Sequence, residues 1–241
     1  MKRMLKIVAI IGLVFGLSLE ANRRLEPVSQ SNIQLSSIVN SKSESAKYRY
    51  IAPFIQSMRT ITGRRYCSAS SIYHRGKIYT VTNRHCCEAS DKTAPLPGFR
   101  IVGTSIQRVI HVDQGADVCI LTSTATKGLS VAKEDPRAFD PLFVMGHPKG
   151  YPLTVREGFM QYTEKVCINY GGYVEQDIRC VESYVSSVVT RPGNSGSPTF
   201  NYEGEVVGVL YAGNDIDSIS VTRKQLLKAL DIARAVYGKN K

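Results

Sequence analysis

The sequence predicts an all-β protein built from two β-barrels and closed by a C-terminal α-helix. Three observations lead to this prediction. From about Ile51 to Tyr211 the chain is a series of short runs rich in β-branched and aromatic residues, separated by turn-forming residues. A polar stretch at 123–138 divides the runs into two sets, and many short strands at such spacing are typical of sandwiches and barrels. Residues 222–238 then carry a helical pattern.

The individual elements follow from local patterns. The first set of expected strands covers 70–73, 77–82, 100–102, 108–112 and 118–122, with a hairpin turn at 74–77. The second set covers 142–145, 154–162, 166–169, 178–189, 198–202 and 206–211. Thr222 and Gln225 form a capping-box pattern, and the apolar residues that follow keep helical spacing until Gly238.

Composition narrows the class of protein. The chain has 241 residues, of which 43% are hydrophobic, so it can bury a sizeable core. Its formal net charge is +11. Such a surface could attract polyanions, but no run of five Lys/Arg and no nucleic-acid-binding signature is present. We therefore expect no nucleic-acid partner.

The N-terminus is typical of an exported protein. Residues 1–21 combine a positive start, an apolar stretch from Ile7 to Leu19 and a small residue, Ala21, for cleavage. Leu19 is larger than a cleavage site prefers, so the segment is a signal peptide or an uncleaved membrane anchor, and the protein is periplasmic or secreted. Residues 22–50 are polar and predict a flexible linker.

Six cysteines suit an oxidising compartment, where they permit up to three disulfides. A metal site is a poor alternative, because Cys86 and Cys87 are adjacent and no C-x-x-C pair has a partner pair. We expect neither a metal nor a cofactor.

Three segments carry residues suited to nucleophilic chemistry. Ser195 stands in the turn 193–198, Gly-Asn-Ser-Gly-Ser-Pro, whose glycines allow a tight bend and free backbone N–H groups. His85 ends the apolar strand that begins near Tyr79. Asp117 immediately precedes the buried-type strand 118–122, where a carboxylate needs a hydrogen-bond donor such as an imidazole.

Rival residues exist for each role. Asp113 is the competing acid, and Asp117 is favoured because an apolar strand follows it directly. His74, His111 and His147 are the competing bases, although none stands at a strand end before a cysteine as His85 does. Ser197 is interpreted as a packing residue.

Together these segments resemble the trypsin-like peptidases, most closely the compact HtrA-type protease domain without a PDZ segment. The order His, Asp, Ser along the chain matches that of chymotrypsin. Further similarities are the Gly-rich turn at 146–150, the segment 154–158, the hairpin at 204–208 and the final helix. The resemblance covers roughly residues 60–238. It implies two antiparallel six-stranded barrels, at 51–128 with His85 and Asp117, and at 129–241 with Ser195.

The resemblance also implies roles. Ser195 attacks the scissile carbonyl, His85 is the general base, Asp117 orients the imidazole, and the N–H groups of Gly193 and Ser195 form the oxyanion hole. The implied function is an exported serine endopeptidase that acts on proteins or peptides. A catalytically silent binding module on the same fold is the alternative.

Further expectations rest on the same resemblance. It implies disulfides Cys67–Cys86 and Cys167–Cys180, and leaves Cys119 as a small buried hydrophobe and Cys87 unassigned. Neutral Asn194 stands where zymogen-type relatives carry an Asp, so that activation switch is not expected, and Arg100–Gly103 is interpreted as a strand rather than a cleavage site. The specificity pocket, expected to favour small or medium apolar side chains, is lined by Val189, Thr190, Tyr211, Ala212, Gly213 and Ser218 to Ser220.

Overall fold

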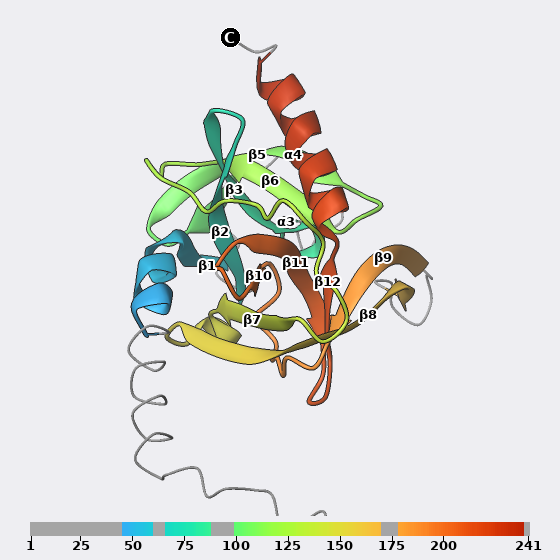
Figure 1. Cartoon of the computed structure of the whole chain (residues 1–241). Helices are drawn as coiled ribbons and strands as arrows, with labels where there is room; N and C mark the ends of the chain where they lie inside the picture. Colours follow the sequence, from blue (N-terminus) through green and yellow to red (C-terminus); the bar gives the residue numbers. More distant parts are fainter. Residues whose placement is uncertain (1–44, 60–65, 88–98, 170–177, 239–241) are drawn as a thin grey trace, which may run out of the picture. The chain divides into compact units, whose positions relative to one another are not determined.

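The computed structural model describes residues 45–59, 66–87, 99–169 and 178–238, which contain two closed antiparallel β-barrels (Figure 1). The first barrel runs in the order β1 (Ile55–Arg59), β2 (Tyr66–His74), β3 (Lys77–Asn83), β6 (Val118–Thr122), β5 (Ser105–Asp113) and β4 (Phe99–Val102), which pairs back with β1. The second runs in the order β10 (Pro198–Asn201), β11 (Val206–Gly213), β12 (Ser218–Val221), β9 (Ile178–Ser186), β8 (Thr154–Asn169) and β7 (Pro141–Gly146), which pairs back with β10. The expected fold class is confirmed.

Alternating side chains fill the barrels, as the period of a strand requires. Ala69, Val109 and Leu121 are buried in the interior of the first barrel. The rings of Phe143 and Phe200, which stack with centroids 4.7 Å apart, belong instead to the apolar cluster that joins both barrels and the C-terminal helix. Burial of these side chains is the main favourable term for each barrel.

The C-terminal helix α4 (Arg223–Gly238) follows the second barrel but packs against β5 and β6 of the first. Its buried stripe consists of Leu226, Ala229, Leu230 and Ala233. The capping box is present: Gln225 Oε1 accepts the main-chain N–H of Thr222 at 3.0 Å.

The strand pattern differs from the expectation in three places. Strands β1 and β12 were not anticipated, because both are short and mix polar with apolar residues. The two strands expected at 154–162 and 166–169 are one strand, β8, since exposed polar residues between them still pair with β9. Solvent-facing residues interrupt the apolar pattern without interrupting the backbone ladder.

The N-terminal expectations lie mostly outside the described residues. The signal or anchor segment at 1–21 and the linker as far as residue 44 are not described. Residues 45–50, the end of that expected linker, are helical together with residue 51. In the part of the chain that the structure covers, no helix combines the length and the apolar character needed to cross a membrane.

Candidate active site

The pairing of β3 with β6 brings His85 and Asp117 together. These antiparallel strands align Asn83 with Val118, so the residues just after Asn83 face the residue just before Val118. Helix α3 (Arg84–Cys87) begins at that point and carries His85. The two side chains therefore meet at one end of the first barrel although 32 residues separate them.

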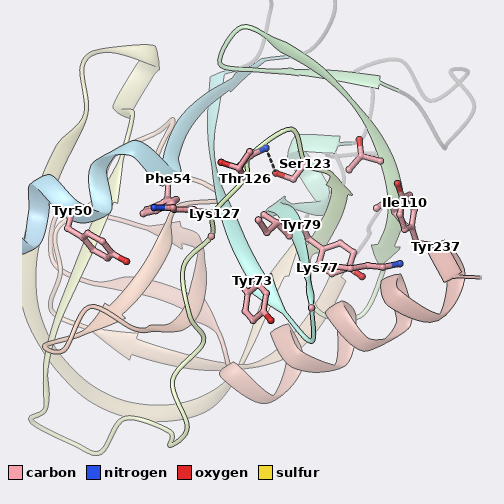
Figure 2. Close-up of a pocket in the computed structure, with 15 residues that line it drawn as sticks. Tyr50, Phe54, Tyr73, Lys77, Tyr79, Ile110, Ser123, Thr126, Lys127 and Tyr237 are labelled. Atoms are coloured by element: carbon pink, nitrogen blue, oxygen red, sulfur yellow. Dashed lines mark hydrogen bonds between the residues drawn. The ribbon is translucent and has the colours of Figure 1, made fainter.

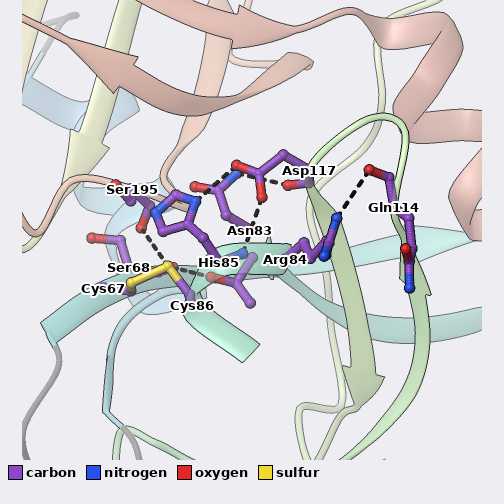
Figure 3. Close-up of polar contacts among 10 residues, drawn as sticks. Cys67, Ser68, Asn83, Arg84, His85, Cys86, Gln114, Asp117 and Ser195 are labelled. Carbon is purple, nitrogen blue, oxygen red and sulfur yellow. Dashed lines mark hydrogen bonds and ion pairs between the residues drawn. A yellow bond between two sulfur atoms is a disulfide. The ribbon is translucent and has the colours of Figure 1, made fainter. Parts of the chain in front are cut away.

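The carboxylate of Asp117 is bound to His85 through both of its oxygens (Figure 3). Oδ1 accepts the main-chain N–H of His85 at 3.0 Å, and Oδ2 accepts Nδ1–H of the ring at 2.8 Å. The Asp117 side chain is only 2% exposed, whereas that of His85 is 26% exposed. A buried carboxylate is costly unless donors satisfy it, and His85 supplies two. This geometry fixes the ring and leaves Nε2 unprotonated when His85 is neutral.

The backbone around Asp117 is also anchored. Its main-chain carbonyl accepts hydrogen bonds from Asn83 Nδ2 at 3.1 Å and from the N–H of Arg84 at 3.0 Å. Asp117 itself has φ 53°, in the left-handed region where non-glycine residues are uncommon. Such strain persists where surrounding contacts over-determine the conformation, and it clusters at functional sites.

The rival acid and bases have other partners. Asp113 accepts the N–H groups of Gly115 and Ala116 through Oδ1, so it caps a turn. His74 binds Asp231 of α4 at 2.8 Å, and His147 contacts the carbonyl of Tyr151 at 3.0 Å. His111 lies in β5, where burial lowers its pKa and the charge of Asp113 opposes that shift.

In the turn that carries Ser195, from Pro192 to Gly196, a hydrogen-bond partner can be sought for each backbone carbonyl and N–H group in order. Every carbonyl from Pro192 to Ser195 accepts a hydrogen bond: the donors are Lys149 N–H, Ser68 Oγ, Ser197 N–H and Ser68 N–H, at 2.8, 3.0, 2.9 and 2.7 Å. The N–H groups of Asn194 and Gly196 donate to Arg191 and Leu210. Within the described part of the chain, the N–H groups of Gly193 and Ser195 have no acceptor.

The hydrogen bonds of the turn explain the direction in which the N–H of Gly193 points. In a trans peptide the N–H points opposite to the C=O. Because Lys149 holds the carbonyl of Pro192, the N–H of Gly193 points away from Lys149. Gly193 has φ 97°, and a Cβ there would lie 2.2 Å from the nitrogen of Lys149, so only glycine fits. A pair of free N–H groups two residues apart can bind a developing oxyanion.

Ser195 lies on the side of the His85 ring opposite Asp117 (Figure 3), and its main-chain oxygen is 3.9 Å from Cys86 Sγ. Its side chain is partly exposed, whereas Ser197 and Asn194 are buried. Neither the Ser197 hydroxyl nor the side-chain oxygen of Asn194 has a hydrogen-bond partner among the described residues. An ionised Asp in place of Asn194 would be a buried charge without compensation.

Two disulfides flank His85. Cys67–Cys86 joins α3 to β2, and Cys87–Cys119 joins α3 to β6. The third, Cys167–Cys180, links β8 with β9. The expectation for Cys119 was wrong: it is bonded to Cys87, because the same register that aligns Asn83 with Val118 brings Cys119 beside α3. Both bonds fix the position of the segment that carries His85.

The residues expected to line the specificity pocket lie on β11, β12 and the segment before Ser195. Val189 is 39% exposed, and Thr190 is buried beside it. Tyr211 is buried and its hydroxyl contacts Ser183; burial raises the pKa of Tyr211 to about 12, and the charge of Asp117 adds to the rise. Ala212 is partly buried and Gly213 exposed, while Ser218 and Ser220 are buried, with their hydroxyls paired to Ser186 and Thr199.

Figure 2 shows a cavity of about 660 Å³. Its lining includes the first residues of β3 and the last residue of β6, which are the opposite ends of these strands from His85 and Asp117. Aromatic side chains and two lysines line it, among them Tyr73, Tyr79, Lys77 and Lys127. It contains none of the residues of the Ser195 turn.

Cys67, His85 and Cys86 are the one cluster in the described residues with enough potential ligands for a metal ion. The two sulfurs form a disulfide and cannot bind as thiolates. The site therefore offers no metal-binding set in this oxidised state.

Comparisons with known proteins identify the family and the fold. A family model described as the trypsin-like peptidase domain matches residues 67–209. A probable periplasmic serine endoprotease, DegP-like, from Marinomonas sp. is 26% identical over 162 residues, which are 65% of this chain and 32% of that protein. The chain thus spans about a third of the length of this curated relative.

Solved structures share the fold. The active form of the Rv3671c protease from M. tuberculosis has a TM-score of 0.63 and 17% identity, covering 77% of this chain and 82% of that one. The HtrA-type protease AlgW, solved with a tripeptide, has a TM-score of 0.62 and 18% identity, covering 77% and 61%. The family model alone covers more than half of the sequence. The chain therefore belongs to the family of trypsin-like peptidases.

Proposed function

We propose that this protein is a serine endopeptidase that cleaves peptide bonds through an acyl-enzyme on Ser195. The observation that carries the proposal is the two-oxygen contact between Asp117 and His85 beside the Ser195 turn. Nε2 of His85 accepts the Ser195 proton as the hydroxyl attacks the substrate carbonyl. Asp117 stabilises the imidazolium that forms, and that imidazolium then protonates the leaving amine.

The oxyanion of the tetrahedral intermediate would be bound by the free N–H groups of Gly193 and Ser195. Donors that are fixed before the reaction cost no reorganisation when charge develops. All four carbonyls from Pro192 to Ser195 are held by hydrogen bonds, so these donors are fixed. The alternative, a catalytically silent binding module, would have no need for two unpaired N–H groups in a fully anchored turn.

Labelling with a fluorophosphonate probe tests the proposal. The purified protein is expected to react in a 1:1 ratio, and tandem mass spectrometry should locate the phosphonate on Ser195. An unfolded protein such as reduced casein should be cleaved, and labelled enzyme should not cleave it. A folded protein that neither reacts nor cleaves would support the silent module instead.

We expect the pocket to favour substrates with small or medium apolar side chains before the scissile bond. A Cβ at Gly213 would lie 2.1 Å from Thr190 Oγ1, so the Thr190 side chain packs directly on the wall formed by Gly213. The exposed Val189 adds no charge to attract Lys or Arg. Ser218 and Ser220 are buried and their hydroxyls contact Ser186 and Thr199, so these residues add no charge to the pocket either.

Thr190→Gly is therefore expected to enlarge the pocket. For matched peptides with Ala or Phe before the scissile bond, the kcat/KM ratio Phe/Ala should rise at least ~10-fold, since each buried methylene is worth about 10- to 200-fold in discrimination. The ratio is measured within one enzyme preparation, so a partly inactive variant does not disturb it. An unchanged ratio would show that Thr190 does not limit the pocket.

Export also belongs to the proposal. The signal-like segment at 1–21, the three disulfides and the periplasmic DegP-like relative all support it. The protein would then act on proteins or peptides outside the cytoplasm.

A further inference from the structure

Ser68, a residue of β2 that the sequence analysis did not single out, joins the first barrel to the Ser195 turn. It follows Cys67 and is fully buried. Its N–H donates to the carbonyl of Ser195 at 2.7 Å, and its hydroxyl donates to the carbonyl of Gly193 at 3.0 Å. One residue of the first barrel thus holds two of the four carbonyls in the turn of the second.

The Ser68 hydroxyl also connects a third segment. It accepts the main-chain N–H of His147 at 2.8 Å. His147 precedes η2 (Pro148–Gly150), the segment in which Lys149 N–H binds the carbonyl of Pro192. A serine hydroxyl has one donor and can accept further bonds. This single oxygen therefore links the Ser195 turn to the loop that fixes the preceding carbonyl, that of Pro192.

Ser68 is itself held in place. Its carbonyl accepts the Thr82 hydroxyl at 2.8 Å, and the neighbouring Cys67 is bonded to Cys86 in α3. Thr82 lies in β3, the strand that leads to His85. The same residue therefore connects the segment that carries the base with the turn that carries the nucleophile.

We infer that Ser68 is a positioning residue for the oxyanion hole: its hydroxyl fixes the carbonyl of Gly193 and the loop at His147, and so orients the free N–H groups of Gly193 and Ser195. It touches neither substrate nor reacting atoms. The inference rests on the proposed function, because it assigns a task within the same site. Its main-chain bond to Ser195 survives any side-chain substitution, so the hydroxyl can be tested alone.

Ser68→Ala is the test. Removing the hydroxyl leaves the carbonyl of Gly193 and the N–H of His147 without their partner. We expect kcat to fall about 10-fold with KM changed less than ~2-fold, below the 10²–10³-fold cost of losing an oxyanion donor outright. Affinity for a peptide trifluoromethyl ketone, whose adduct carries an oxyanion, should fall by a similar factor, and Ser68→Thr should restore part of both.

Ser71→Ala is the matched control. Ser71 is another buried serine of β2, and in the described chain no hydrogen bond joins its hydroxyl to residues 192–196. It should keep wild-type kcat and inhibitor affinity. Rates are divided by the fraction of enzyme that reacts with the fluorophosphonate, so loss of folded protein does not imitate the effect.

The outcomes separate the two proposals. A wild-type protein that fails to react with the fluorophosphonate overturns the proposed function. A reactive wild type with a Ser68→Ala variant of equal kcat and equal inhibitor affinity overturns the role of Ser68 alone. Equal losses in Ser68→Ala and Ser71→Ala would also overturn it, by showing a general effect of losing a buried hydroxyl.

Discussion

Asp117→Asn is expected to lower kcat about 10⁴-fold while the protein stays folded, the magnitude known for the equivalent change in a chymotrypsin-fold enzyme. In the structure Asp117 accepts two donors, the main-chain N–H of His85 and the ring Nδ1–H. An asparagine has one oxygen and one NH₂ group. The main-chain N–H of His85 can only donate, so it takes the oxygen.

The NH₂ group of the new asparagine then faces Nδ1 of His85. The ring must accept there, which moves its proton to Nε2. A protonated Nε2 cannot take the proton of Ser195, and general-base catalysis is lost. Ser195→Ala should cost as much or more, and the double variant should be little worse than Ser195→Ala, because the residues act as a unit.

Asp113→Asn is the matched control for this prediction. Only Oδ1 of Asp113 accepts the turn N–H groups, and an asparagine keeps that oxygen. Its kcat should remain within about twofold of wild type. For all variants kcat is measured by peptide hydrolysis and is corrected for the fraction of folded protein, which circular dichroism gives. Inactivation by Asp113→Asn with an active Asp117→Asn would reverse the assignment of the acid.

The meeting of His85 and Asp117 in the candidate site could be predicted because both residues stand at strand ends with distinct local patterns. The apolar runs before His85 and after Asp117 mark β3 and β6, and the glycines around Ser195 mark a tight turn. A carboxylate before a buried strand, as at Asp117, is costly to desolvate unless a hydrogen-bond donor meets it. The local sequence therefore pointed to these residues, although they come together only in the folded protein.

Contacts that depend on register or on the meeting of the barrels could not be predicted in this way. Cys119 pairs with Cys87 only because β3 and β6 align as they do, and nothing in the spacing of the cysteines gives that alignment. Ser68 resembles any small residue of a buried strand. Its role depends on where β2 meets the Ser195 turn and His147, segments 127 and 79 residues away.

Gly196→Ala is expected to damage both stability and activity through one close approach. Gly196 has φ 85°, and a Cβ there would lie 2.1 Å from the carbonyl oxygen of Ser68 and 2.2 Å from Thr82 Oγ1. These two atoms are hydrogen-bonded to each other, so the methyl group would force β2 and the Ser195 turn apart. We expect kcat to fall at least ~100-fold, since small misplacements of reacting groups have effects of this size.

Gly76→Ala separates this contact from backbone strain. Gly76 has φ 86°, almost identical to that of Gly196, but no atom lies within 4 Å of its added Cβ. Both variants carry the left-handed cost of about 1–2 kcal/mol in the free energy of unfolding. Only Gly196→Ala should add an overpacking cost of about 1–3 kcal/mol and the loss of activity.

Urea unfolding and peptide hydrolysis distinguish these contributions. Gly76→Ala should shift the urea midpoint and leave kcat unchanged, because its hairpin turn lies at the end of β3 remote from His85. Gly196→Ala should shift the midpoint further and lose its activity. Equal midpoints together with equal kcat values would mean that the barrels can separate slightly at no cost. The position of Ser195 would then not depend on contact with β2, and the role of Ser68 would lose its structural basis.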